Sequence, residues 1–383
     1  MENSNPSIEA LSLLRKELHQ YPEVSGNEKN TAQRIISFLK NYPPDEIITE
    51  VGEHGILALY KAKAAGKKLL FRSELDALPI EETNTFAHRS TIEGVSHKCG
   101  HDGHMAILCG LAMKLYHKRP DTGTVMLLFQ PAEEDGSGAA RVFNDPKFDY
   151  KPDFAFALHN LPGYPKHQIV IKNNTFTCAV NSMVIQLKGK TAHAGEPEKG
   201  INPTLAIAAI ISKFNSAIQP DISQSDYCLI TPIYTRIGSK AYGVSAGDGE
   251  VHFTVRSNSN VQMKNVERFL ENTVKELASQ FQLVSSIEWI ECFQANENNL
   301  QAAQHIRQAA KTNGLELLEK EFPFTWGEDF GLFTQQFPGA MFGLGSGLKT
   351  PALHNPDYDF PDEIITTGVA TFYTITKQLL HAH

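Results

Sequence analysis

The chain has 383 residues and a formal net charge of −8, with 41% apolar and 20% charged residues. This length exceeds that of one typical hydrophobic core and predicts two domains, while the acidic balance argues against a nucleic-acid-binding surface. The sequence shows no secretion-signal pattern at its start, and no apolar run approaches the roughly 20 residues that cross a bilayer. Five dispersed cysteines suit reduced thiols. We therefore expect a cytoplasmic protein without nucleic-acid or membrane partners.

The first third of the chain alternates between helical and strand patterns. Asn5-Pro6 marks a helix start, and apolar residues at helical spacing follow to residue 18. Ser25 and Glu28 match a capping box and predict a second helix that runs to about residue 39. A further helix is expected over 104–117, and buried strands over 56–60, 68–71, 125–129 and 154–158. Such a mixture predicts an α/β domain, in which helices cover both faces of a mixed sheet.

From about residue 180 the pattern changes to strands that alternate apolar and polar residues. Strands near 183–188, 227–237, 251–256 and 283–292 are interleaved with helices at 203–218 and 261–281. This β-α-β-β-α-β order is the ferredoxin-like split motif. We therefore expect residues 180–292 to form an inserted α+β domain, and residues 1–179 and 293–383 to form the first domain. In the returning segment, helices are expected to end near 314, to begin at 326–330 and to span 361–381, with a strand at 340–344.

Residues 97–104 read HKCGHDGH and hold three imidazoles, one thiol and one carboxylate. These groups are ligands of borderline metals such as zinc. Further candidates stand far along the chain, at the pair Glu133–Glu134, at His159 and at His354. A structural zinc module would place its ligands in short paired spacings. Ligands spread over so much of the sequence instead indicate a site that a whole domain assembles, beside the carboxyl ends of its strands.

Five ligands are too many for one open tetrahedral zinc site and suit two metal ions that share bridging groups. The candidate ligands are Cys99, His101, Glu134, His159 and His354. Glu133 is adjacent to Glu134 and could not easily serve the same metal. A carboxylate in this place suits a general base that takes a proton from water.

Each of these residues also has a plainer interpretation. His97 and His104 could be polar caps or residues of a helix surface. Glu133 and Glu134 could belong to a solvated acidic turn, His159 could be a core histidine, and His354 could lie in an ordinary loop. Together these plainer interpretations become improbable, because every candidate belongs to the same metal chemistry.

The motifs resemble the M20 family of metallopeptidases, and within it the amidohydrolase branch of aminoacylases, hippurate hydrolases and indole-acetyl-amino-acid hydrolases. The matching stretches run in family order over nearly the whole chain: SELDALPIEE, HKCGHDGHM, QPAEED, LHN, GKTAHAGEP, WGEDFGLF, PGAMFGLGSG and LHNPDYDFPDE. The resemblance implies a catalytic α/β domain that is interrupted by a ferredoxin-like lid domain.

The resemblance also implies roles for individual residues. The five candidate ligands would bind two divalent metal ions, most simply zinc or manganese, with cobalt or nickel as alternatives. Glu133 would be the general base, and Asp76 would orient a ligand. His193 would hydrogen-bond the developing oxyanion. In dimeric members of the family this histidine comes from the neighbouring subunit, so a homodimer through the lid domain is one expected assembly. Glu74 stands where peptidase branches carry a ligating histidine and is not counted as a ligand.

The sequence therefore predicts a metal-dependent amidohydrolase. A metal-activated water would cleave the amide bond of an N-acyl amino acid or a related small peptide-like amide. Arg256, on a strand of the lid domain, is a candidate for the carboxylate of the substrate, because arginine binds carboxylates bidentately; it could equally belong to a solvated strand face. A dipeptidase or aminoacyl carboxypeptidase of the same family is one alternative. The other is a descendant without catalysis that only binds peptides, against which the filled ligand positions argue.

Overall fold

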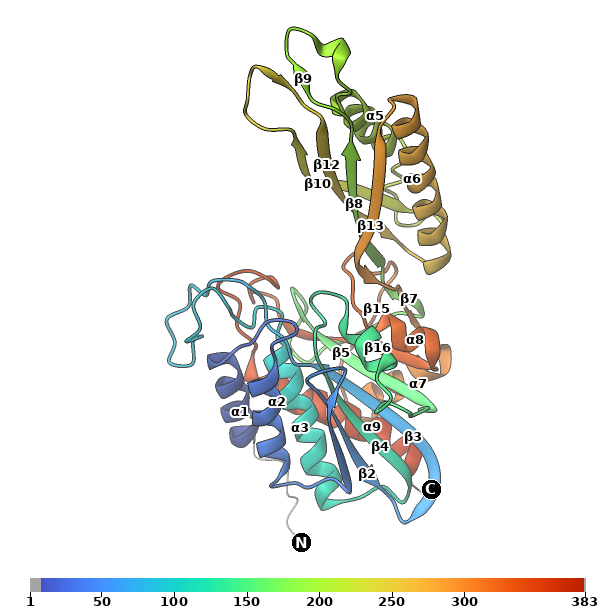
Figure 1. The fold of residues 1–383 in the computed structure, drawn as a ribbon. Helices are drawn as coiled ribbons and strands as arrows, with labels where there is room; N and C mark the ends of the chain where they lie inside the picture. The colour runs from blue at the N-terminus through green and yellow to red at the C-terminus, as the bar shows by residue number, and fades with distance from the viewer. Residues whose placement is uncertain (1–7, 382–383) are drawn as a thin grey trace. The chain divides into compact units, whose positions relative to one another are not determined.

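The computed structural model describes residues 8–381, so the predicted helix start at Asn5-Pro6 lies outside the described residues. The chain divides into two compact units (Figure 1). Unit 2 comprises Thr177–Ala295 together with the short segment Phe322–Glu328, and unit 1 comprises the remainder. Among the described residues, no helix is both long and apolar enough to cross a membrane.

Unit 1 is built on an eight-stranded mixed sheet with the strand order β1-β2-β4-β3-β5-β16-β6-β15. The four central strands β4, β3, β5 and β16 run parallel to one another, whereas β1 and β2 pair antiparallel. The strands are β1 (Glu46–Val51), β2 (Gly55–Lys61), β3 (Ala64–Glu74), β4 (Thr122–Gln130), β5 (Phe154–Pro162), β6 (Ile169–Ile171), β15 (Leu317–Glu319) and β16 (Gly339–Gly347). The expected mixed sheet is confirmed. The edge strand β1 and the short strands β6 and β15 were not predicted: β1 and β15 consist mostly of exposed or half-buried residues, and the apolar run of β6 is only three residues long.

One face of this sheet carries the main hydrophobic core. Phe71 of β3 stacks on Phe156 of β5 at 5.5 Å between ring centroids and meets Phe372 at 4.9 Å. The helices that share this core are α1 (Ile8–Gln20), α2 (Lys29–Leu39), α3 (His101–His117), α7 (Leu300–Thr312) and α9 (Ile365–Leu380). Helix α3 is buried almost throughout, because it lies between the sheet and the outer helices. It begins at His101, three residues before the predicted start, so that this histidine stands at its first turn.

The other face carries two short helices, α4 (Gly138–Asn144) and α8 (Gly331–Gln336), whose Phe143 and Phe333 rings lie 4.8 Å apart. Neighbouring strand residues point to opposite faces, so Arg72 leaves β3 on the side away from Phe71. Its guanidinium lies 5.9 Å from the Phe330 ring.

Unit 2 has four antiparallel strands in the order β10-β12-β8-β13 and two helices. In chain order these elements are β8 (Ala179–Lys188), α5 (Thr204–Asn215), β10 (Cys228–Ile237), β12 (Asp248–Ser257), α6 (Asn260–Gln280) and β13 (Val284–Phe293). Met183, Ile185 and Leu187 face the core of the unit, and the alternate residues face outward. The short strands β9 (Ala192–His193) and β11 (Val244–Ser245) form a separate two-stranded ladder. Two further strands, β7 (Asn174–Thr177) and β14 (Asn296–Asn298), pair with each other and lie almost entirely in unit 1.

Two local predictions are wrong. The helix expected to open at 326–330 begins only at Gly331, because Phe322–Glu328 belongs to unit 2 and the Asp329 carboxylate accepts bonds from Gln130 and from the Ala139 N–H. The capping box of Ser25 and Glu28 does not form either.

Helix α2 begins at Lys29, and Glu28 is its N-cap residue without a side-chain capping bond. Glu23 takes over the capping instead, because its carboxylate accepts the Thr31 N–H at 2.7 Å. The side chain of Ser25 bonds instead to Asp76, which follows β3, and that of Glu28 bonds to Ala132, which follows β4.

Candidate metal centre

The candidate residues of unit 1 lie where three parallel strands end and helix α3 begins. Asp76 follows β3 by two residues, Glu133 and Glu134 follow β4, and His159 stands near the end of β5. His101 is the first residue of α3. The carboxyl ends of parallel strands are the usual place for ligand sites in such sheets.

All five predicted ligands and Glu133 converge on one place. Ligand atoms lie within 4.8 Å of one another in three overlapping groups: Cys99, His101 and His159; Cys99, Glu134 and His354; His101, Glu133 and Glu134. The Cys99 Sγ and His159 Nε2 atoms are 3.4 Å apart. The set offers one sulfur, three imidazole nitrogens and carboxylate oxygens, which are the donors that zinc and similar divalent ions prefer.

His101 is fully buried, and its Nδ1 lies 2.9 Å from the Asp76 carbonyl oxygen. Because that oxygen can only accept, Nδ1 carries the proton and Nε2 is the nitrogen available to a metal. The buried Nε2 atom makes no hydrogen bond to a described residue, although carboxylate oxygens of Glu133 and Glu134 lie at 3.7 and 3.8 Å. An unsatisfied buried nitrogen that faces carboxylates is the arrangement expected when a cation belongs between them.

The electrostatics around His101 also favour a cation. Burial lowers the pKa of His101, but the bond to Asp76 and the charges of Glu74 and Glu134 outweigh it and raise the pKa to about 10. In the metal-free protein a proton therefore supplies positive charge at this ring. Burial also raises the pKa of the Cys99 thiol, and the Glu134 and Glu133 carboxylates raise it further. A thiolate at this position thus requires a compensating positive charge, which a bound divalent metal provides.

The turn after β4 aims the two adjacent glutamates. Ala132 has a positive φ of 53°, a left-handed conformation that residues other than glycine rarely adopt. The Glu134 N–H donates to Asp76 Oδ2 at 2.9 Å, and Glu134 Oε2 lies 3.8 Å from His354 Nε2. His354 itself has a φ of 65°, and about half of its side chain is exposed.

Asn160 connects the segments that carry the ligands and was not predicted. Its carbonyl oxygen accepts from His159 Nδ1 at 2.9 Å, which turns His159 Nε2 toward Cys99. Its side-chain nitrogen donates to the Tyr358 hydroxyl at 2.5 Å, on the loop that carries His354. A side chain at Gly100, which has a φ of 93°, would come within 2.6 Å of the Asn160 amide. The sequence signal for this role is its place in the LHN stretch, directly after His159.

The interpretation of His97 and His104 as caps or surface residues is wrong. Both are buried, because α3 starts at the centre of unit 1. His104 lies between Glu74, at 2.7 Å from Nδ1, and the Asn160 side-chain oxygen, at 2.7 Å from Nε2. Glu74 also pairs with the buried Arg72, so its carboxylate has two side-chain partners. Burial lowers the pKa of His97 to about 3.

The two remaining predicted site residues, His193 and Arg256, belong to unit 2. His193 is exposed in β9, and its Nδ1 accepts the Gly195 N–H at 3.0 Å. The half-buried Arg256 of β12 donates to the Thr325 carbonyl oxygen at 2.6 Å. Among the described residues, Arg256 forms no ion pair with a carboxylate.

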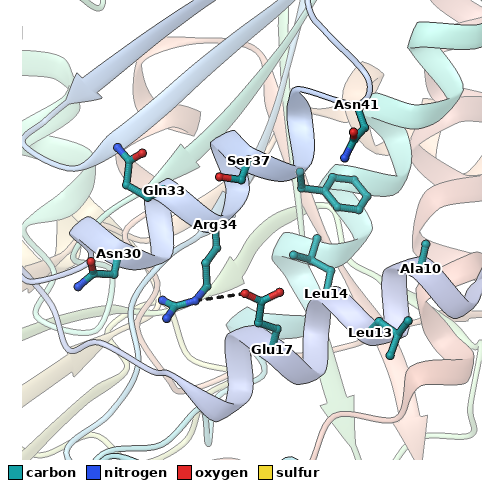
Figure 2. A pocket seen from close by; sticks show the side chains of 10 residues that line it. Ala10, Leu13, Leu14, Glu17, Asn30, Gln33, Arg34, Ser37 and Asn41 are labelled. Atoms are coloured by element: carbon teal, nitrogen blue, oxygen red, sulfur yellow. Dashed lines mark ion pairs between the residues drawn. The ribbon is translucent and has the colours of Figure 1, made fainter.

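A surface groove of about 620 Å³ between α1 and α2 is separate from this centre. Figure 2 shows Leu13, Asn41 and the pair of Arg34 and Glu17, whose Nε and Oε1 atoms lie 3.6 Å apart. None of the candidate ligands lines this groove.

Comparisons with known proteins agree with this geometry. The model of peptidase family M20/M25/M40 matches residues 70–378. An N-acetyldiaminopimelate deacetylase from Bacillus subtilis (strain 168) is 30% identical over 363 residues, which cover 94% of this chain and 96% of the relative. An N-acetylcysteine deacetylase from the same strain is 28% identical over 94% of each chain.

Solved structures share the fold. A dinuclear metal-binding peptidase of the M20 family from Bacillus subtilis superposes with a TM-score of 0.83 at 26% identity, covering 97% of this chain and 98% of that one. An aminobenzoyl-glutamate utilization protein from Klebsiella pneumoniae has the same fold, with a TM-score of 0.73 at 19% identity over 97% and 95% of the two chains. The chain therefore belongs to peptidase family M20/M25/M40, and the prediction of a metal-dependent amidohydrolase is confirmed.

Proposed function

We propose that this enzyme removes the acyl group from N-acyl amino acids, releasing a carboxylate and a free amino acid. The observation that carries the proposal is the convergence of Cys99, His101, Glu134, His159 and His354 beside the carboxylate of Glu133. The deacetylase names of the two Bacillus subtilis relatives support a small acyl group.

The five converging residues would hold two divalent metal ions, zinc or manganese first and cobalt or nickel as alternatives. The dinuclear metal-binding relative supports this number of ions. When bound, such ions lower the pKa of a water molecule and polarise the amide carbonyl of the substrate. Cys99, His101 and Glu134 each belong to two of the three overlapping groups, which joins the groups into one site.

Glu133 would accept a proton from the attacking water and deliver it to the leaving nitrogen. Its Oε2 atom lies 3.7 Å from His101 Nε2, so the base stands directly beside the proposed ligands. Asp76 would orient two of its neighbours: its carbonyl oxygen fixes the His101 ring, and its carboxylate holds the Glu134 backbone. Burial raises the pKa of Asp76, but its contacts with His101 outweigh this effect and lower it, so the side chain remains an acceptor.

Two residues of unit 2 would bind the substrate from the side of the lid. His193 would donate a hydrogen bond to the oxyanion, and its exposure leaves Nε2 accessible for this role. Arg256 would pair with the carboxylate of the amino acid, since among the described residues its guanidinium donates to a backbone carbonyl and to no carboxylate. We propose that His193 reaches the substrate by lid closure or from a second subunit.

A homodimer through unit 2 is part of the proposal. Ile233 and Tyr234 of β10, Tyr242 of the loop before β11 and Val244 of β11 are exposed apolar side chains. Such side chains are typical of surfaces that a partner covers. We also propose a cytoplasmic location, which the five free cysteines support.

The test is a hydrolysis assay with the purified protein, loaded in turn with zinc, manganese, cobalt or nickel. The substrates are N-acetyl, N-benzoyl and N-indoleacetyl amino acids, with unblocked dipeptides for comparison. We expect turnover of at least one N-acyl amino acid, its loss on complete chelation, and its return when metal is added back. Full activity after verified metal removal would contradict the mechanism. Turnover of dipeptides alone would identify a dipeptidase and contradict the proposed substrate class.

A further inference from the structure

The loop between α1 and α2 reaches the candidate centre through two side chains that the capping-box prediction had assigned to helix α2. Glu28 is fully buried, and its Oε1 atom accepts two backbone N–H groups, from Gly26 at 2.9 Å and from Ala132 at 2.8 Å. Ser25 donates its hydroxyl to Asp76 Oδ2 at 2.7 Å. The bond between Glu28 and Ala132 joins residues that are 104 positions apart, and Ala132 directly precedes the pair Glu133–Glu134.

The bond from Ala132 to Glu28 supports a turn whose backbone conformation is unfavourable. Ala132 is buried and has a φ of 53°, which an L side chain adopts only when its surroundings enforce it. Its carbonyl oxygen accepts the Gly138 N–H at 2.8 Å, and a side chain at Gly138 would come within 1.8 Å of the Pro131 carbonyl. The turn is thus fixed on its amide side by Glu28 and on its carbonyl side by Gly138.

The direction of the next two side chains depends on this turn. Glu133 and Glu134 follow Ala132 directly and place their carboxylates 3.7 and 3.8 Å from the same His101 nitrogen. The Glu134 N–H is held by Asp76, whose same oxygen is held by Ser25. A change in the Ala132 backbone would therefore move the proposed base and the proposed ligand together.

We propose that Glu28 is a positioning residue for the general base and for the Glu134 ligand. Its carboxylate holds Ala132 in the left-handed conformation that aims both side chains at His101. This inference rests on the proposed function, because the base role of Glu133 belongs to it.

The experiment compares three variants after metal loading. Glu28→Ala removes the acceptor of both N–H groups, whereas Glu28→Gln keeps an oxygen that can accept them. Glu23→Ala is the matched control, because Glu23 lies in the same loop but, among residues 8–381, its side chain bonds only to Asn30 and Thr31. We expect Glu28→Ala to lower kcat about 10- to 100-fold with KM changed by less than about threefold, since misplacement by 1 Å can cost that much. Glu28→Gln and Glu23→Ala should stay within about threefold of the wild type.

A second measurement does not depend on turnover. The metal affinity of each apoprotein, determined by competition with a chelator, should weaken about 10- to 100-fold in Glu28→Ala and remain unchanged in both other variants. If Glu28→Ala does not fold, Glu28→Met is measured in its place, because methionine keeps the volume of the side chain but cannot accept the two N–H groups as the carboxylate does.

The proposal is overturned if Glu28→Ala keeps the kcat and the metal affinity of the wild type. A fall in its melting temperature alone, as in Glu23→Ala, would then show that Glu28 only stabilises the fold. A wild-type protein that hydrolyses no N-acyl amino acid would contradict the proposed function. In that case the metal-affinity comparison would still decide whether Glu28 positions Glu134.

Discussion

Helix α1 contributes a histidine to a buried network of charges, and this predicts a specific pH dependence of stability. His19 is fully buried between two carboxylates, with Nδ1 at 2.8 Å from Asp102 and Nε2 at 3.1 Å from Glu82. Burial lowers the pKa of His19, but its bonds to Asp102 and Glu82 outweigh it and raise the pKa to about 9. The pKa values of both carboxylates lie well below their usual range, so both stay ionised where His19 titrates.

The sign and size of the effect follow from the difference between folded and unfolded states. An unfolded histidine titrates near its ordinary value of 6.5, whereas His19 in the folded protein keeps its proton up to about pH 9. The resulting stabilisation is fully present below pH 6.5 and is lost as the pH rises through 9. A shift of this size corresponds to about 3 kcal/mol of unfolding free energy.

The perturbation is His19→Gln, which keeps a polar side chain but cannot carry the charge. We expect the difference in unfolding free energy between wild type and variant to shrink by about 3 kcal/mol between pH 6 and pH 10. His117→Gln is the control for the exchange of a histidine for a glutamine, because His117 is exposed at the end of α3.

Urea unfolding of the metal-free protein, followed by far-UV circular dichroism, measures these differences. Tryptophan fluorescence is unsuitable, because Trp289 and Trp326 both belong to unit 2. A difference for His19→Gln that does not vary with pH would refute the reasoning, since it would mean that His19 binds no additional proton in the folded state.

Three further predictions concern the metal centre. Glu133→Gln should retain metal and lose turnover about 10²- to 10⁴-fold, whereas Glu134→Gln should lose metal occupancy; metal analysis and kcat together check this, and the reverse pattern would exchange the two roles. His193→Ala should lower kcat about 10²- to 10³-fold with unchanged metal content, and a kcat within about twofold of the wild type would identify an ordinary surface histidine. Asn160→Ala should weaken metal binding about 10- to 100-fold in chelator competition, because His104 and the Tyr358 segment lose their common side-chain partner; an unchanged affinity would count against that role.

The sequence predicted the elements of both units where the apolar pattern was strong. The runs at 56–60, 125–129 and 154–158 lie within β2, β4 and β5, which are buried on both faces and need apolar side chains throughout. The candidate ligands were recognisable for a different reason: histidine, cysteine and glutamate carry their chemistry in their side chains, and their positions after strands indicated a common edge. Short edge strands such as β15 left no such signal, because their exposed residues follow no apolar pattern.

Local patterns misled where a distant residue offered a better partner. Ser25 and Glu28 have the spacing of a capping box, but their side chains bond elsewhere. The Ser25 hydroxyl donates to Asp76, and the Glu28 carboxylate accepts the Ala132 N–H. A sequence pattern predicts hydrogen bonds between residues that are close in the chain, whereas in the folded protein the same groups can bond to residues that are distant in the chain. Such failures therefore concentrate around the functional site, where residues from many segments meet.

The buried charges next to the ligands show where the sequence did carry a further signal. Arg15 and His19 stand four residues apart, and Arg15 stands four residues after Leu11, so charged and apolar residues share one face of α1. A charged residue in an apolar stripe is costly unless a partner of opposite charge is buried with it. Asp102 supplies that partner to both side chains, and it follows His101 directly in α3. The two charged residues in the apolar face of α1 therefore indicate a buried partner in another element. Through Asp102 they fix the first turn of α3, in which His101 directs Nε2 toward the metal centre.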